Sequence, residues 1–177
     1  MDDGPAGSII LFLILILLSG YFSGTEISLA SVNRIHMISK ASKGQKSAER
    51  VLYILDNFDE ALSVLLIGNN VAHIGCATLA TVFTAKNFGD AWVTLSTAIV
   101  TVIVFIFGEM IPKCFARSCN ETFAEISSVF LIGLMKVLKP FSLLFTAIST
   151  LASKPFLKNV ENELNYQKYK LLIQKYY

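Results

Sequence analysis

Charged residues and cysteines are both scarce in this chain. Asp, Glu, Lys and Arg make up only 16% of the 177 residues, whereas soluble domains carry about 25%. The net charge of +2 excludes a nucleic-acid binder, and the composition is not that of a disordered tail. The three cysteines lack metal-ligand spacing, which disfavours a disulfide scaffold and a structural zinc site.

Apolar residues are correspondingly abundant. They form 54% of the chain, and the mean hydropathy is +0.59. A soluble single domain is therefore excluded as the default class. The composition predicts an integral membrane protein with room for about three or four spans.

Long apolar runs predict membrane-spanning helices over about residues 8–31, 61–84 and 91–111. The first run could instead be a secretory signal peptide, but Asp2 and Asp3 precede it where a signal peptide would be basic. Only a short turn separates the second run from the third, so these spans must form an antiparallel hairpin. The predicted fold class is an all-α integral membrane protein with three transmembrane helices per protomer.

Basic residues concentrate between the first and second spans, at Arg34, Lys40, Lys43, Lys46 and Arg50. The positive-inside rule places this segment and everything after Lys113 in the cytoplasm, with the N-terminus outside. We expect short cytoplasmic-side helices over about residues 34–55. The break between them is expected near Lys43 and Gly44.

The stretch over about residues 120–157 is apolar but carries Lys136, Lys139 and Pro140 near its middle. A lysine at the bilayer centre costs about 2.5 to 3.5 kcal/mol. We therefore favour a juxtamembrane belt of amphipathic, interfacial helices hinged at Pro140 over a kinked fourth span. Residues 1–157 then form the transmembrane domain, and the polar residues 158–177 are a linker towards a soluble part.

Polar residues interrupt the first span at Ser19, Ser23 and Glu26. Their spacings of four and three residues place them on one helical face. A serine in a span often bonds back to its own helix, and Gly20 with Gly24 could serve only helix packing. Glu26 favours a functional interpretation, because a carboxylate inside a membrane is costly.

The second span carries Gly68, Asn69 and Asn70 at its middle, with His73 one turn later. Carboxamides deep in a span must be paired or must line a wet cavity, and a glycine permits a local break that frees carbonyls. Hydrogen bonding between helices is the structural alternative. His73 is expected as a neutral partner of this network rather than as a metal ligand.

The third span ends with Gly108 and Glu109, followed closely by Pro112 and Lys113. Proline has no N–H and disfavours helix at the preceding residue, so the helix is expected to break or kink beside Glu109. Glu109 then either presents its carboxylate to a cation or forms a structural ion pair with Lys113.

These motifs, one per span and in this order, resemble the transmembrane domain of the CorC and cyclin M (CNNM) magnesium transporters. They are residues 22–26 (FSGTE), 67–70 (IGNN) and 108–113 (GEMIPK). The resemblance implies a dimer of three-span protomers with a juxtamembrane belt that moves Mg2+ across a membrane, coupled to sodium in some members. The family usually has a second asparagine where this chain has His73, and imidazole is a poor partner for Mg2+.

The candidate metal site is oxygen-rich and draws on all three spans: Ser19, Ser23, Glu26, Gly68, Asn69, Asn70, Gly108 and Glu109. Such oxygens suit a hard cation such as Mg2+, the expected transported ion, with Na+ as a further candidate, rather than zinc, copper or iron. Pro112, Lys113 and His73 are expected to act in gating or in supporting the structure. The domain is thus interpreted as an ion-transport domain rather than an enzyme.

Other function classes stay open. The domain could be a membrane anchor that senses Mg2+ and does not transport it. An intramembrane hydrolase would pair Ser23 with His73, but no further motif supports that chemistry.

The expected partners are membrane lipid and a second copy of the chain, in the plasma or inner membrane. The expectation of a homodimer rests on the resemblance. The resemblance also implies that this domain is followed by cytosolic CBS domains, which bind adenine nucleotide. The dimer is expected to be held through small residues of the second and third spans that permit close approach, Gly75, Ala77, Ala80 and Ser96.

Overall fold

The computed structural model describes residues 5–141, which contain no strand and are helical almost throughout. Three of the helices are long and apolar enough to cross a membrane, Ala6–Ser31, Phe58–Phe88 and Asp90–Ser118. The predicted all-α fold with three spans is therefore confirmed. The predicted linker over residues 158–177 and the belt beyond residue 141 lie outside the described residues.

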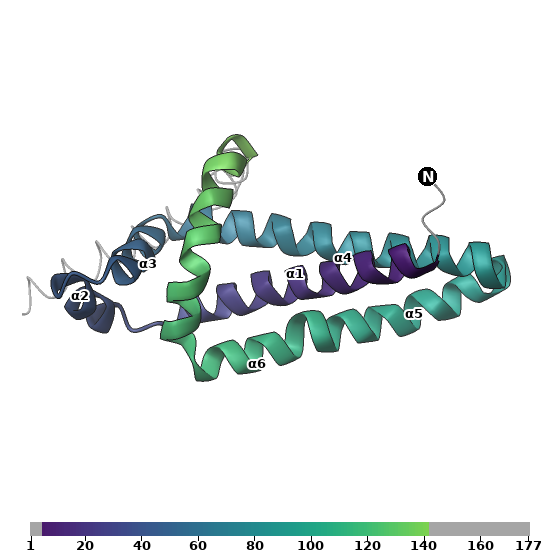
Figure 1. Cartoon of the computed structure of the whole chain (residues 1–177), viewed down its shortest axis with the longest axis horizontal. Coiled ribbons are helices and arrows are strands. Elements are labelled where there is room, and N and C mark those ends of the chain that lie inside the picture. The colour runs from purple at the N-terminus through teal and green to yellow at the C-terminus, as the bar shows by residue number, and fades with distance from the viewer. Residues whose placement is uncertain (1–4, 142–177) are drawn as a thin grey trace, which may run out of the picture.

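The first span is α1 (Pro5–Ser31) and the second is α4 (Phe58–Phe88). At 1.5 Å per residue, α1 is about 40 Å long and exceeds the hydrocarbon core of about 30 Å. The third span is built of four consecutive pieces: the 3-10 turn η1 (Asp90–Trp92), α5 (Val93–Ile103), the π-helical η2 (Val104–Met110) and α6 (Ile111–Ser118). Figure 1 shows α1 lying between α4 and the third span, and α1 contacts both.

A tight turn at Gly89 joins α4 to the third span. The φ angle of Gly89 is 89°, in the left-handed region that favours glycine. This turn folds the two spans into the antiparallel hairpin that their short connection predicts.

The short helices α2 (Arg34–Ser42) and α3 (Lys46–Asp56) form a hairpin at the other end of the spans. They part near Lys43 and Gly44, as predicted, and Gly44 takes a φ angle of 83°. The helix over residues 120–141, here called the juxtamembrane helix, crosses the same end of the spans (Figure 1). The hydrophobic core lies here, because both short helices and the juxtamembrane helix bury apolar side chains together, including Met37, Val51, Ile54, Leu131 and Met135.

The third span runs through Pro112 to Ser118, whereas the sequence analysis ended it at residue 111 and expected a break or kink. The backbone N–H of Ile111 bonds to the carbonyl of Ile106, which is the spacing of a π-helix. A proline removes one backbone donor, and the wider π turn accommodates that loss. The predicted break beside Glu109 was therefore wrong: the helix continues through a π-helical stretch at this position.

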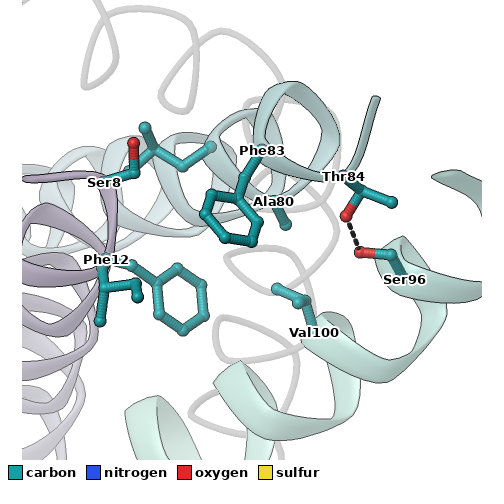
Figure 2. A pocket seen from close by; sticks show the side chains of 9 residues that line it. Ser8, Phe12, Ala80, Phe83, Thr84, Ser96 and Val100 are labelled. Carbon is teal, nitrogen blue, oxygen red and sulfur yellow. Dashed lines mark hydrogen bonds between the residues drawn. The ribbon is translucent and has the colours of Figure 1, made fainter. Parts of the chain in front are cut away.

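Three of the four small residues expected at a dimer interface make contacts within the protomer. A Cβ atom on Gly75 would lie 2.9 Å from Cδ1 of Leu15 on α1, and Ala80 is buried. Ser96 shares a hydrogen bond of 2.6 Å with Thr84 across the α4–α5 contact (Figure 2). At these positions α4 and α5 use their small residues to approach α1 and each other, and the dimer interface stays a prediction.

Gly68 allows α1 to approach α4, since a Cβ atom there would lie 2.5 Å from Cζ of Phe22. We expect Gly68→Ala to lower the melting temperature in detergent by several degrees, because overpacking costs about 1 to 3 kcal/mol. The matched control Gly133→Ala has open space around its Cβ. It should be neutral or slightly stabilising, because alanine is the better helix former. Equal melting temperatures for the two variants would contradict this packing.

Ion pairs outside the spans hold the α2–α3 hairpin against the juxtamembrane helix. Lys40 Nζ lies 2.8 Å from Glu125 Oε1 and 3.1 Å from Glu121 Oε2, and His36 Nδ1 lies 2.6 Å from Glu121 Oε1. Ser47 Oγ donates to Glu125 Oε2 at 3.0 Å. The hydrogen bond to His36 lowers the pKa of Glu121, and the hydrogen bond to Glu125 raises the pKa of Lys40.

These shifts predict that the hairpin stays docked across neutral pH. The lowered pKa of Glu121 means that its contribution is present at neutral pH and is lost as the pH falls through the folded-state pKa. The raised pKa of Lys40 means that its contribution is lost only as the pH rises past about 10.5. Each partly exposed pair contributes at most about 1 kcal/mol.

We expect the double variant Glu121→Gln, Glu125→Gln to be cleaved several-fold faster by trypsin after Lys43 at neutral pH. The reason is that the α2–α3 hairpin opens more often when its ion pairs are lost. The control Glu49→Gln removes an exposed carboxylate of α3 outside this network. Cleavage of the double variant at the wild-type rate would show that apolar packing alone docks the hairpin.

Candidate functional site

The hydroxyl of Ser19 is the point where all three spans meet. Ser19 Oγ donates to Asn69 Oδ1 on α4 at 2.8 Å and to the Gly108 carbonyl on η2 at 3.1 Å, and it lies 2.8 Å from His73 Nε2. Ser23 Oγ donates to the same Asn69 oxygen at 3.4 Å. Both serines are fully buried. We call these five residues the neutral cluster.

Two features of the sequence free the Gly108 carbonyl for this role. In an α-helix the carbonyl of residue 108 would accept from the N–H of residue 112, which is a proline without that donor. A side chain at residue 108 would also block the approach, because a Cβ atom there would lie 2.9 Å from Ser19 Oγ. The π-helical η2 thus turns a backbone oxygen towards α1.

A second group of side chains is charged. Lys113 Nζ lies 2.8 Å from Glu109 Oε1 and 3.6 Å from Glu26 Oε2, so one ammonium links carboxylates of the first and third spans. Each of the three side chains is about one-third exposed. We call them the charged cluster. Two carboxylates facing one ammonium leave one negative charge, which attracts a further cation.

The two clusters are stacked along the bundle. Ser19, Ser23 and Glu26 follow one another on a single face of α1 and cover about 10 Å of its length at 1.5 Å per residue. On the third span, Gly108 of the neutral cluster directly precedes Glu109 of the charged cluster. Glu26 therefore lies about one turn of α1 from Ser23 and about two turns from Ser19.

Comparison with known proteins gives the family. Residues 10–172 match the family model described as the cyclin M transmembrane N-terminal domain. The chain belongs to this family. The resemblance to the CorC and cyclin M proteins is therefore confirmed.

Relatives of the chain include bacterial members of this family. An inner membrane protein of Escherichia coli, UPF0053 protein YfjD, is 36% identical over 75% of the chain, and a UPF0053 protein of Haemophilus influenzae is 35% identical over 79%. A more distant relative, 25% identical over 84% of the chain, is the polyamine export protein of Haemophilus influenzae. The chain spans only 31%, 34% and 38% of these three relatives.

Not every residue predicted for the metal site of this cyclin M domain belongs to the neutral cluster or the charged cluster. Asn70 is exposed on α4, and Gly68 packs on Phe22. Successive residues of a helix point about 100° apart, so Asn69 and Asn70 cannot both face α1. Pro112 packs beside α1, where a Cβ atom on Gly20 would lie 3.0 Å from its Cγ.

Two features near the clusters were not predicted from the sequence, an ion pair between spans and a cavity. The contact between Glu26 and Lys113 joins two spans, and nothing in the spacing of either residue points to it. A cavity of about 330 Å3 between α4 and the third span is lined by residues of both clusters, His73 and Glu109, together with Ala77 and Thr101. Alanine and threonine are ordinary residues in a span, so the sequence gives no signal for this cavity.

A separate pocket lies close to the Gly89 end of the bundle and holds none of the predicted metal-site residues. Its volume is about 170 Å3. Figure 2 shows Phe12 of α1, Phe83 of α4 and Val100 of α5 on its walls. Its lining is largely apolar, which distinguishes it from the two clusters.

Proposed function

We propose that this domain is a membrane transporter that moves Mg2+, with Na+ as a candidate coupling ion. Membership of the cyclin M family supports cation transport in general. Mg2+ prefers oxygen ligands, and the neutral cluster gathers hydroxyl, amide and backbone oxygens from three spans. The substrate and the coupling are our proposal.

The observation that carries this proposal is the environment of Ser19 Oγ. A hydroxyl has a single proton, yet two of its neighbours, Asn69 Oδ1 and the Gly108 carbonyl, are both acceptors. In the tautomer that carries its proton on Nε2, His73 donates to a Ser19 lone pair. The acceptor oxygens here outnumber the protons that they can share, and a bound cation would coordinate the oxygens that lack a donor.

The charged cluster supports the proposal by supplying compensation for a divalent charge. A divalent ion is costly in a low-dielectric span unless anionic groups offset it. Glu26 and Glu109 lie next to the neutral cluster along the bundle. In the structure the ammonium of Lys113 contacts both carboxylates. An arriving cation then competes with Lys113 for the two carboxylates.

A second candidate function is export of an alkylammonium such as a polyamine. The specific observation is that Glu26 and Glu109 already bind a primary ammonium, that of Lys113. A relative named as a polyamine export protein favours the same class of substrate. A membrane anchor that senses Mg2+ and does not transport it is the remaining alternative.

Flux into reconstituted vesicles separates these functions. Vesicles containing the protein are loaded with a Mg2+ indicator and exposed to Mg2+ with or without a Na+ gradient, or are exposed to radiolabelled 1,4-diaminobutane, with protein-free vesicles as the control. We expect Mg2+ flux that depends on the protein. Flux of the diamine alone would favour polyamine export, and Mg2+-dependent thermal stabilisation without flux would favour the sensor.

We also propose that the α2–α3 end is cytoplasmic, that the Gly89 turn faces the outside, and that the domain is a homodimer. The basic residues of the hairpin support the orientation. Labelling of a cysteine introduced at Lys43 from outside intact cells would overturn it. Light scattering in detergent that gave one protomer at all concentrations would overturn the dimer.

A further inference from the structure

Within residues 5–141, the serine hydroxyls and the glycine of the neutral cluster are closed off from the surface. Ser19 and Ser23 are fully buried, and Gly108 is buried as well. A cation that reaches Ser19 Oγ therefore needs a route through neighbouring side chains. The structure offers one beside His73.

That route is the cavity of about 330 Å3 between α4 and the third span. Its lining reaches from Val100 to Glu109 along the third span, about 13 Å at 1.5 Å per residue. Glu109 belongs to the charged cluster and His73 to the neutral cluster, so one cavity touches both. We call this cavity the vestibule.

His73 separates the vestibule from the buried oxygens. Its Nε2 atom lies 2.8 Å from Ser19 Oγ, and its side chain also lines the vestibule. Before a cation can use the Ser19 oxygen from this side, the imidazole must give up that hydrogen bond and swing aside. His73 therefore has the position of a gate.

We propose that a cation moves between Glu109 and the neutral cluster through the vestibule, and that His73 is the gate between them. The inference rests on the proposed cation transport and adds the path and its gating residue. The vestibule is large enough for several waters, each of which needs about 10 to 15 Å3 of such space, and His73, Thr101 and Glu109 offer polar partners in an otherwise apolar lining. Room for water matters because Mg2+ dehydrates reluctantly.

Cysteine labelling tests the path in the full chain after Cys76, Cys114 and Cys119 have been replaced. Thr101→Cys places a thiol in the vestibule, and Val102→Cys is the matched control one residue away, which is exposed like Thr101 but lies outside the vestibule lining. We expect a cationic methanethiosulfonate to modify Thr101→Cys about tenfold faster than the control. Mg2+ should slow this modification, and the modified protein should lose most of its flux.

The gate is tested by the accessibility of a cysteine at the buried Ser19. We expect Ser19→Cys to label about tenfold faster with His73→Ala than with His73 present, because the ring no longer covers it. His73→Gln keeps an N–H donor and comparable bulk, and should restore the slow labelling. Equal rates in all three backgrounds would overturn the role of His73.

The outcomes separate the path from the transport function. If the unmodified Thr101→Cys protein transports Mg2+ and still does so after complete modification, the vestibule proposal is wrong and the proposed function stands. If neither the wild-type protein nor the unmodified Thr101→Cys protein transports Mg2+, the proposed function fails. In that case, protection of Thr101→Cys by Mg2+ still supports ion entry into the vestibule, and absence of protection overturns it.

Discussion

Replacing Glu109 with glutamine is expected to lower Mg2+ flux by about 100-fold while the protein stays folded. The carboxylate offsets the charge of an ion inside the membrane, where an uncompensated charge costs about 2.5 to 3.5 kcal/mol. Each 1.4 kcal/mol corresponds to about a factor of ten. The glutamine keeps the size of the side chain and an oxygen for Lys113, and Glu26 remains 3.6 Å from that ammonium.

The measurement combines flux in vesicles with thermal unfolding at increasing Mg2+. Wild-type protein at a Mg2+ concentration of 100 times Kd should gain about 2.7 kcal/mol of stability. Glu109→Gln should lose this gain together with the flux, whereas the control Glu49→Gln on the exposed side of α3 should keep both. If Glu109 only anchors Lys113, the variant will be less stable yet will transport normally per folded molecule, and the proposed role of Glu109 will be wrong.

Hydropathy and periodicity predict a large part of this domain. An apolar run of about 20 residues has few alternatives to a spanning helix, so all three spans were predicted, although the third extends to Ser118 rather than ending at residue 111. The break between α2 and α3 at Gly44 was predictable because glycine favours turns and helix ends. On α1, spacings of three and four residues correctly grouped Ser19, Ser23 and Glu26, because these positions share a face in any α-helix.

The rotation of each span about its axis is what the sequence leaves undetermined. Asn69 and Asn70 are chemically identical, yet the packed helix turns the first towards Ser19 and leaves the second exposed, with Gly68 packed against Phe22 beside them. Pairing between spans is equally hidden, which is why Lys113 was linked to Glu109 in sequence but not to Glu26. Pro112 predicts a disturbed helix but does not reveal that a π-helical stretch will replace the break.

The π-helical stretch changes how the site is interpreted. An unwound segment would have supplied several free carbonyls, whereas η2 directs the Gly108 carbonyl to Ser19. The side-chain oxygens of α1 and α4 therefore carry more of the proposed coordination than the sequence analysis assumed. Among them, Ser19 contacts both other spans, while Ser23 makes a single long hydrogen bond to Asn69.

This difference predicts that Ser19→Ala will be much more damaging than Ser23→Ala. Loss of the Ser19 oxygen should weaken Mg2+ binding by about 10-fold to 100-fold and raise the Mg2+ concentration needed for half-maximal flux. Ser23→Ala should give a several-fold effect. Ser28→Ala is the matched control, because Ser28 is equally buried on α1 but bonds to the Ala116 carbonyl outside both clusters.

Stability measurements separate coordination from simple helix packing. Each of these serine variants removes a buried donor, so each costs about 1 to 3 kcal/mol of stability if its acceptor stays unsatisfied. Only Ser19→Ala should also lose the stabilisation by Mg2+, because Ser28 touches no proposed ligand. If Ser19→Ala and Ser28→Ala lose stability alike and both keep a normal response to Mg2+, Ser19 only joins the spans, and the ion must bind elsewhere.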